Sequence, residues 1–574
     1  MAKNQEIANI FYQIADMLEI LNVQWKPQAY RKAARSIETL SEDIEKIYRE
    51  GGEKALMEIP GVGEGIAKKI IEYLEKGKIT EYEKLKKKIP TGVEEMMNVE
   101  GLGPKKAYRL YKELKIGSLE KLEKAAKEGR IRRLEGFGEK SEQDILRGLE
   151  FFKKSQERML LGKALPIAQE ITKKIKALKE VERVDIAGSL RRRKETIGDI
   201  DILVISKRPK PVMDFFTKMD NVAHVVAKGD TKSTVMLKEG IECDIRVLEA
   251  KSYGAALNYF TGSKDHNVRL RQIAIKKGMK LSEYGLFNVK TEKYITGRTE
   301  EEVYKKLGLV YIEPEMRENT GEIELAQKKN LPELIKYNSI KGDLHTHTKW
   351  TDGLHSTEES AQLGLKMKYE YIGITDHSKS TYVAHGLDEK GILKRLEEIE
   401  KVQKKISKIK LFKGAEIDIN ANGSLDYRNQ ILKQMDIRLV AIHSRFKSPK
   451  EEMTKRILKA LENPYVNILC HPTGRLINQR EPYEADLEKI FQTAKDNNVA
   501  LEINSHPQRL DLHDIHIKQA LEFGCKFAIN TDAHSLDHFR FIEFGVAQAR
   551  RGWLTEKDVI NAWPLKKLEK WLGK

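Results

Sequence analysis

The sequence predicts a multi-domain protein with an all-helical N-terminal part and mixed α/β parts after it. Three changes of pattern along the 574 residues support this. Apolar residues recur at three- and four-residue spacing up to about residue 155, short β-branched runs begin near 183, and strands alternate with helices from 338. A chain of this length is too long for one hydrophobic core, so we expect several domains.

Composition and charge exclude several classes of protein. With 40% hydrophobic and 33% charged residues, the chain is expected to be globular rather than disordered. It has no run of about 18 apolar residues, so no membrane partner is expected. The net charge of +17 favours a polyanionic partner, because basic side chains that neutralise phosphates release condensed counterions. The scattered cysteines Cys243, Cys470 and Cys525 predict neither a disulfide framework nor a zinc motif, as is typical of a cytoplasmic protein.

A glycine–hydrophobe–glycine turn occurs three times in the N-terminal third, each time between helices. The copies are Gly61-Val62-Gly63, Gly101-Leu102-Gly103 and Gly136-Phe137-Gly138, and Lys68 and Lys105 follow the first two. Backbone N–H groups at the start of the next helix suit a phosphate. Such a turn can simply join two helices, but its repetition favours binding. The turns resemble helix-hairpin-helix motifs, which implies that they grip the DNA backbone without reading its sequence.

Three aspartates in the middle of the chain have the spacing of a metal site. Asp199 and Asp201 lie two apart in the strand DIDILVIS, so both carboxylates project from one face. Asp244 lies in a second strand, ECDIRVL, expected alongside. Three carboxylates can hold two divalent ions for phosphoryl transfer, and oxygen ligands favour Mg²⁺ or Mn²⁺. An isolated Asp-x-Asp is usually polar surface; Gly188-Ser189 shortly before it makes the pattern more specific.

This combination resembles the nucleotidyltransferase superfamily, and residues 259–271 (YFTGSKDHNVRLR) closely resemble the nucleotide-binding segment of family X DNA polymerases. The resemblance covers about residues 1–315. It implies that Asp199, Asp201 and Asp244 are catalytic and bind metal. It also implies nucleotide contacts from Arg158, Gly188, Ser189, Arg192, Gly198, Tyr259, Phe260, Gly262, Asn267 and Arg271. Lys264 stands where an acidic residue is common, so base stacking there is expected to differ.

The first helices resemble the lyase domain of DNA polymerase beta (AYRKAARSI, then PGVGEGIAKKI). The resemblance places Lys69 at the position whose amine forms a Schiff base with an abasic sugar, and Lys26 at a phosphate-binding position. Gly65 stands where a second phosphate-binding lysine is expected. Lys69 is therefore either a lyase nucleophile or a lysine that only contacts phosphate.

Histidines concentrate in the C-terminal third, where twelve of the fourteen follow residue 338. Strands are expected at 340–347, 370–377, 410–419, 437–443, 466–472, 500–505 and 526–534, with helices between them, which predicts a parallel barrel. All but one of the seven strands have a metal-ligand residue near the C-terminal end. The exception is the strand at 500–505, which has Asn504, Ser505 and His506 there instead. The expected ligands are His345, His347, Asp352, His377, Glu416, His443, His471, Asp532 and His534. Nine such groups can bind about three Zn²⁺, Mn²⁺ or Fe²⁺ ions for hydrolysis.

The HTHT, TDH, CHP and TDAH motifs closely resemble the PHP (polymerase and histidinol phosphatase) domain. The resemblance implies three ion sites. His345, His347, Glu416 and Asp532 form the first, His443 and His471 share Glu416 in the second, and Asp352, His377 and His534 form the third. Five further histidines of this region are expected at the surface or behind the ligands: His355, His385, His513, His516 and His538.

A family X polymerase followed by a PHP domain is the arrangement of bacterial and archaeal PolX proteins. The resemblance implies gap filling in base excision repair and a Mn²⁺-dependent 3′–5′ exonuclease, with cleavage at abasic sites as a further activity. The implied partners are gapped or primer-template DNA and dNTPs, and we expect a monomer. Three alternatives stay open: a phosphatase for small phosphoesters tethered by the N-terminal part, a nuclease guided by an inactive polymerase, and a template-independent transferase.

The expected domains follow from these motifs. Residues 1–85 form a lyase-like helix-hairpin-helix domain and 86–155 a second helix-hairpin-helix subdomain. Residues 156–250 form the catalytic palm, 251–320 the subdomain that contacts the nascent base pair, 321–337 a linker, and 338–574 a distorted (β/α)7 barrel of the PHP type.

Overall fold

A computed structural model describes residues 2–21, 23–38, 44–86, 91–97, 99, 102–156 and 158–573. The chain divides into two compact units, and each is described by itself. The first comprises residues 1–156 with 478–480, and the second residues 157–477 with 481–574. Among the described residues, no helix is both long and apolar enough to cross a membrane.

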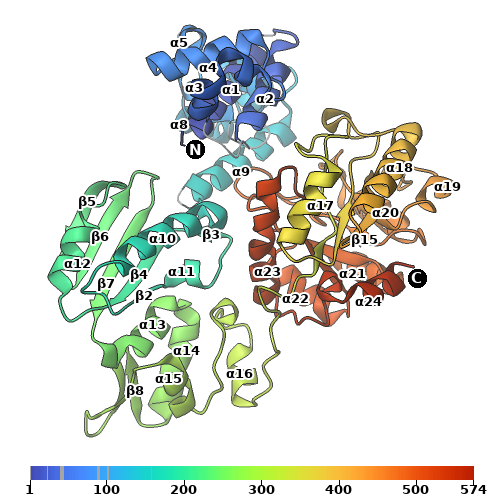
Figure 1. Cartoon of the computed structure of the whole chain (residues 1–574). Coiled ribbons are helices and arrows are strands. Elements are labelled where there is room, and N and C mark those ends of the chain that lie inside the picture. Colours follow the sequence, from blue (N-terminus) through green and yellow to red (C-terminus); the bar gives the residue numbers. More distant parts are fainter. Residues whose placement is uncertain are drawn as a thin grey trace. The chain divides into compact units, whose positions relative to one another are not determined.

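The first unit is all helical, as the sequence predicts (Figure 1). Its helices are α1 (Ala2–Ile20), α2 (Lys26–Glu38), α3 (Ile44–Met57), α4 (Glu64–Lys76), α5 (Thr80–Lys86), α6 (Thr91–Met97), α7 (Pro104–Leu114), α8 (Leu119–Lys127) and α9 (Glu139–Gln156). Ile7, Phe11, Ile14 and Leu18 of α1 are buried, because three- and four-residue spacing puts them on one helix face. A single apolar core runs from Ile7 to Leu149.

The second unit begins with a five-stranded mixed sheet in the order β2-β4-β7-β6-β5. The elements of this first part of the unit, in chain order, are β1 (Met159–Leu160), α10 (Leu161–Lys176), β2 (Arg183–Ile186), α11 (Gly188–Arg191), β3 (Thr196–Ile197), β4 (Asp199–Ile205), α12 (Pro209–Phe216), β5 (Val222–Lys228), β6 (Lys232–Leu237) and β7 (Glu242–Leu248). β4 and β7 pair in parallel, and the other neighbours in the sheet pair antiparallel. Helices α10 and α12 pack their apolar sides into the core beneath the sheet.

A smaller α/β part follows the sheet. It contains α13 (Tyr253–Thr261), α14 (Lys264–Lys276), β8 (Met279–Ser282), β9 (Gly285–Asn288), β10 (Tyr294–Thr296), α15 (Glu300–Leu307) and α16 (Glu322–Gln327). Its core contains Leu270 and Val303 together with Ile323 and Ala326 of α16. Part of the segment expected as a linker is therefore built into this core.

The last part is a barrel of seven parallel strands that neighbour one another in chain order. Its elements are β11 (Gly342–Asp343), α17 (Thr357–Lys366), β12 (Tyr371–Ile374), α18 (Glu389–Lys405), β13 (Lys410–Asp418), α19 (Asn429–Leu432), β14 (Ile437–Ala441), α20 (Lys450–Leu461), β15 (Ile468–Leu469), α21 (Leu487–Asp496), β16 (Ala500–Asn504), α22 (Asp514–Glu522), β17 (Phe527–Asn530), α23 (Ile542–Arg551) and α24 (Leu565–Leu572). A bridge between Thr346 and Ala533 links the first and last strands just past their ends. This confirms the predicted (β/α)7 barrel.

Strand alternation determines what fills the barrel. Ile437, Leu439 and Ala441 of β14 belong to an inner core that also contains Leu568 of α24, whereas Val440 belongs to the core under the outer helices. Apolar side chains and α24 therefore occupy one end of the barrel, and the carboxyl ends of the strands are left for polar side chains.

Candidate functional site

Three carboxylates come together on one face of the mixed sheet. β4 and β7 pair so that Asp201 and Asp244 are direct Cα partners, and Asp199 lies two residues earlier on β4. The intervening residues of these strands, Ile200 and Cys243, are buried in the core on the opposite face. The spacing that predicted this site is thus matched by the register of the strands.

The three negative charges on this face are only partly balanced by the cations Lys232 and Arg246. Burial, together with the charges of Asp199 and Asp244, raises the pKa of Asp201 to about 7. Lys232 lies 3.4 Å from Asp244, and the Thr234 hydroxyl donates a hydrogen bond to the same carboxylate. Three oxygen donors with so little compensation are a donor set that fits divalent cations such as Mg²⁺.

The turn after β2 brings a possible phosphate-binding loop against these carboxylates. Gly188 has φ of +62°, and a Cβ on it would lie 2.1 Å from Oδ2 of Asp201. Only glycine fits this backbone at such close approach. The Ser189 hydroxyl is buried and makes no hydrogen bond within the described part of the chain. A buried hydroxyl without a partner suits an oxygen-rich ligand.

Two arginines expected to contact nucleotide have protein partners here. Arg158 donates to the carbonyl of Thr196 at 2.7 Å, and a Cβ on Gly198 would lie 3.0 Å from its guanidinium. Arg192 donates to a Glu318 carboxylate oxygen at 3.2 Å and to the carbonyl of Thr261. Any anionic ligand of Arg192 therefore competes with Glu318 for its guanidinium.

The other expected nucleotide contacts gather where α13 meets α14. The Asn267 amide donates to the carbonyl of Tyr259 at 2.6 Å. The guanidinium of Arg246 lies over the ring of Phe260, 4.5 Å from the centre of that ring. A Cβ on Gly262 would lie 3.1 Å from the Arg192 guanidinium, so this junction adjoins the end of α11. Arg271 is exposed on α14.

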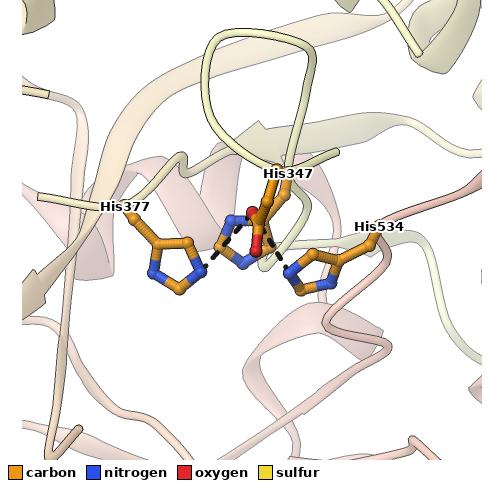
Figure 2. Close-up of side chains that lie close together, drawn as sticks. His347, His377 and His534 are labelled. Carbon is orange, nitrogen blue, oxygen red and sulfur yellow. Dashed lines mark ion pairs between the residues drawn. The ribbon is translucent and has the colours of Figure 1, made fainter. Parts of the chain in front are cut away.

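The rim of the barrel brings all nine expected ligands together. Three sets of side chains have ligand atoms within 4.8 Å of one another. These sets are His347, Asp352, His377 and His534; His345, His347 and Asp532; and His377, Glu416 and His443. His471 joins them through Glu416, 2.8 Å from its Nε2. Figure 2 shows the imidazoles of His347, His377 and His534 pointing toward one another.

Several polar atoms of this cluster are buried without a hydrogen bond. Among the described residues these include His347 Nδ1, Asp352 Oδ1 and His471 Nδ1, whereas His377 Nδ1 and Glu416 Oε2 lie 2.8 Å apart and contact each other. Leaving polar groups unsatisfied in one buried cluster is costly unless a ligand completes them. The mixture of imidazole and carboxylate fits transition-metal ions such as Zn²⁺, Mn²⁺ or Fe²⁺.

The charge states suit metal binding at some of the ligands only. Burial favours a protonated Glu416, but the charges of His443, His377 and His345 hold its pKa well below the usual range. Burial, with the charges of His534 and His377, lowers the pKa of His347 to about 4. A carboxylate and a neutral imidazole are the forms that coordinate metal. Burial lowers the pKa of His443 and His534, but nearby carboxylates outweigh it and raise these pKa values to about 10 and about 9, so both imidazoles must lose a proton before they coordinate a metal.

Sequence reasoning missed several acids behind the ligands. Glu502 lies on β16, the strand without an expected ligand, and is fully buried. It accepts from His345 Nδ1 at 2.7 Å and from the backbone N–H of His471 at 2.8 Å. Asp418 contacts His443 Nδ1 at 3.2 Å. Such acids fix the orientation of ligand imidazoles, and a glutamate between Leu501 and Ile503 in an apolar strand was the available signal.

One further group close to the ligands was also unexpected. The Cys470 thiol, His345 and Glu502 have ligand atoms within 4.8 Å of one another. Among the histidines expected outside the ligand set, His355 is buried and packs near Phe539, with both ring nitrogens unpaired within the described residues.

In the first unit, the three glycine turns share one geometry. The central residues Val62, Leu102 and Phe137 are buried, and each donates its backbone N–H to the carbonyl three residues earlier at 2.9, 3.0 and 2.9 Å. Gly63 and Gly103 precede the first residues of α4 and α7, and no side chain caps these helices. Their first N–H groups are therefore available to a phosphate. Gly101 lies outside the described residues.

The lysines behind the first turn differ from one another. Lys68 is exposed and pairs with Glu64 one helical turn earlier at 2.5 Å. Lys69 is half-buried, 3.0 Å from Glu81, and its amine lies 5.8 Å from the ring centre of Tyr30. Lys105 is exposed at the start of α7. Lys69 is thus held by an acid, whereas Lys68 and Lys105 are accessible to a backbone phosphate.

Five domain models match the chain in order. They are a helix-hairpin-helix domain (2–79), a SAM-like helix-hairpin-helix tandem (93–150), the DNA polymerase beta palm (163–255), the DNA polymerase beta thumb (256–318) and a PHP domain (343–506). Asp532 and His534 lie beyond the matched PHP segment. They follow β17, which neighbours β16 in the barrel.

Known proteins resemble the whole chain or its parts. The DNA polymerase/3′-5′ exonuclease PolX of Bacillus subtilis is 38% identical over 571 residues, which is 99% of both chains. Rat DNA polymerase lambda is 26% identical over 55% of this chain and 57% of its own. A probable phosphatase of Thermoanaerobacter sp. (strain X514) is 33% identical over 38% of this chain and 89% of its own. The phosphatase likeness is partial, whereas the PolX likeness runs from end to end and joins polymerase and PHP domains in the same order, so the chain belongs to the PolX family.

Proposed function

We propose that this chain fills short gaps in DNA with its polymerase part and trims 3′ ends with its PHP barrel. The observation that carries the proposal is the presence of two donor sets of different chemistry in one chain. Carboxylates alone gather on β4 and β7, whereas imidazoles and carboxylates mix at the barrel rim. The first set suits nucleotidyl transfer and the second hydrolysis.

In the polymerase part, Asp199, Asp201 and Asp244 would hold two Mg²⁺ or Mn²⁺ ions. Such ions, when bound, activate the primer hydroxyl and steady the triphosphate. Asp244 is placed to orient that hydroxyl. The Ser189 hydroxyl donates to a phosphate oxygen and Arg192 supplies a fixed positive charge.

The other nucleotide contacts are proposed from their positions around this loop. They are Arg158, Gly188, Gly198, Tyr259, Phe260, Gly262, Asn267 and Arg271. Tyr259, Phe260 and Gly262 would contact the sugar, and Asn267 and Arg271 the minor-groove side of the nascent base pair. The hydrogen bond from Asn267 to Tyr259 supports this, because it ties the two groups of contacts together.

At the barrel rim, the nine residues of the cluster would hold about three Zn²⁺, Mn²⁺ or Fe²⁺ ions. Clustered ions, when bound, activate water and neutralise the charge of a phosphodiester. Glu502 accepts from His345 Nδ1, so the Nε2 of that imidazole faces the cluster, and Asp418 does the same for His443. Glu416 lies within 3.6 Å of five imidazoles, so it is the carboxylate that would bridge the ions.

The proposed partners are gapped or primer-template DNA and dNTPs, bound by a monomer in the cytoplasm. Gly61, Gly63, Lys68, Gly103 and Lys105 would contact the DNA backbone through the described turns, and Gly101 is assigned the same role from sequence alone. The domain boundaries given above and a role for the barrel at abasic sites belong to the same proposal.

A lyase role for Lys69 is a separate proposal. Its ion pair with Glu81 must open before the amine can attack an abasic sugar, because a protonated amine is not a nucleophile. Trapping with borohydride on a 5′-deoxyribose phosphate end, compared between the wild type and Lys69→Ala, tests it.

A second candidate function is a phosphatase for small phosphoesters. The likeness of the barrel to a probable phosphatase supports it. Release of phosphate from nucleotides, without any shortening of a labelled primer, would favour this function over the exonuclease.

Separate variants distinguish the two proposed sites. Asp199→Ala and Asp244→Ala each remove a metal-binding carboxylate from the sheet, so we expect loss of primer extension with retained shortening. His345→Ala should retain extension and lose shortening. The measurement is one gapped, 5′-phosphorylated duplex with a labelled primer, incubated with Mn²⁺ with and without dNTPs.

The control is a folding check on each variant by circular dichroism and thermal unfolding. Loss of both activities in a folded Asp199→Ala chain would contradict two independent sites. Phosphate release without primer shortening in the wild type would contradict the exonuclease and leave the polymerase assignment standing.

A further inference from the structure

A buried arginine of the barrel reaches the nucleotide-binding loop of the polymerase part. Arg551 is the last residue of α23, and its side chain is 2% exposed. Its guanidinium donates to a Glu318 carboxylate oxygen at 3.0 Å and to the backbone carbonyl of Arg192 at 2.8 Å. Its other amino group donates to Asp514 at the start of α22. All of these residues lie in the second compact unit.

Arg551 and Arg192 share one carboxylate oxygen. Arg192 donates from its Nε to the same oxygen of Glu318 at 3.2 Å, and Lys194 lies 4.0 Å from it. The side chains of Arg192 and Glu318 are 13% and 23% exposed, so solvent screens their attraction only weakly. The strength with which Glu318 holds Arg192 therefore depends on how much of its charge Arg551 already satisfies.

We infer that Arg551 is a positioning residue through which the PHP barrel sets the availability of Arg192 for the triphosphate of an incoming nucleotide. This inference rests on the proposed function of Arg192. Arg551 neutralises part of the charge on Glu318, so Arg192 can exchange that carboxylate for phosphate oxygens at lower cost. It also satisfies the Arg192 carbonyl and thereby holds the end of the loop that begins at Gly188.

Without Arg551, Glu318 keeps Arg192 as its closest cation, and the Arg192 carbonyl loses a charged donor. Both changes oppose triphosphate binding and neither touches the metal-binding carboxylates. The effect should therefore appear in the KM for dNTP more than in kcat. The barrel ligands are not involved, so primer shortening should not change.

The neighbouring arginine provides a matched control. Arg550 is also largely buried, and it joins the barrel to the thumb region through Glu315 at 2.8 Å; it also donates to the carbonyl of Ile335 at 2.9 Å. No contact links Arg550 to Arg192 in the described part of the chain. Arg550→Gln therefore disturbs the same boundary without altering the partners of Arg192.

The test is gap filling by the full chain at varied dNTP concentration. Arg551→Gln should raise the KM for dNTP roughly tenfold, the change expected when one charge-assisted contact is lost, and Arg550→Gln should leave it within about twofold. Inorganic triphosphate serves as a competitive inhibitor, and its inhibition constant should rise by the same factor in Arg551→Gln. Primer shortening with Mn²⁺ and no dNTP should match the wild type in both variants.

Two further variants keep the test decisive if Arg551→Gln does not fold. Arg551→Lys keeps a cation beside Glu318 and should give a smaller rise in KM. In a Glu318→Gln background, Arg551→Lys should raise KM by less than in the wild-type background, because the shared charge is gone and only the bond to the Arg192 carbonyl is altered. A wild-type KM in Arg551→Gln, or an equal rise in Arg550→Gln, would overturn the inference.

Arg192→Ala, measured in parallel, separates this inference from the proposed function. If Arg192→Ala binds dNTP as the wild type does, the proposed role of Arg192 fails. If Arg192→Ala loses dNTP affinity and Arg551→Gln does not, the positioning role of Arg551 fails.

Discussion

At the scale of single residues, the absence of one Cβ lets the turn at Gly188 approach the carboxylate of Asp201. Gly188→Ala would place a methyl group 2.1 Å from Oδ2 of Asp201, at a φ of +62°. The strained backbone alone costs about 1–3 kcal/mol, and Asp201 must also move. We expect kcat for primer extension to fall at least tenfold, with primer shortening retained.

Gly240→Ala is the control for this substitution. Gly240 also has a positive φ, +80°, but a Cβ there would meet nothing within 4 Å. The substitution Gly240→Ala therefore strains the backbone without displacing a carboxylate. Comparable losses of synthesis in the two variants would mean that strain, and not the approach to Asp201, limits the reaction.

The same scale shows what sequence can reveal about a site. Asp199 and Asp201 were predictable because a two-residue period in a strand determines which face a side chain occupies. The gathering of the rim histidines was predictable because they follow successive strands of one barrel. Glu502 was not, because its role depends on contacts to His345 and His471, which lie 157 and 31 residues away in the sequence.

At the scale of elements, the first residue of α15 holds the thumb region to the palm. The Glu300 carboxylate accepts from Arg191 of α11 at 2.6 Å and from the fully buried Arg317 at 2.6 Å. Burial opposes its ionisation, but Arg317 and Arg191 lower the pKa of Glu300 to about 2. Glu300→Gln leaves two buried arginines without a counter-charge, so we expect a loss of roughly 3–5 kcal/mol in the stability of this part.

The sign of the pH dependence follows from the lowered pKa. The contribution of Glu300 is fully present above its ordinary value of 4.5 and is lost as pH falls toward about 2. Urea unfolding followed by circular dichroism gives the free energy of unfolding. The difference in this free energy between the wild type and Glu300→Gln should be constant from pH 7 to about 5.5 and should become smaller below pH 4.5. Glu301→Gln, on the exposed side of the same helix, should unfold like the wild type. A difference that stays constant down to pH 3 would refute the assignment.

The type of each element, helix or strand, was largely predictable from the sequence. The tertiary contacts that an element makes were not. All seven barrel strands appear where alternating strand and helix patterns indicated them. The segment 321–337 has no strong pattern of its own, so it was expected as a linker. Helix α16 within it is nevertheless fixed by tertiary contacts, since Glu322 accepts from His266 and Ile323 is fully buried.

At the scale of the whole molecule, a bidentate ion pair joins a loop of each proposed active site within the second unit. Arg475 donates to Glu195 at 2.7 and 3.2 Å, although 280 residues separate them in the sequence. Glu195 lies shortly before Asp199, and Arg475 lies four residues after His471. No periodicity or motif could predict this contact, because it depends on how separately folded parts pack together.

This pair predicts that a substitution in the palm alters the barrel. Glu195→Gln leaves the charge of Arg475, whose side chain is only 10% exposed, without a counter-charge. The loop that begins at His471 should then shift to hydrate it, since an unpaired buried charge costs several kcal/mol. We therefore expect Glu195→Gln to reduce primer shortening several-fold as well as primer extension. Glu170→Gln, which breaks only an exposed pair with Lys174, should leave both activities unchanged. If Glu195→Gln lowers extension alone, the pair supports the palm loop but does not position His471.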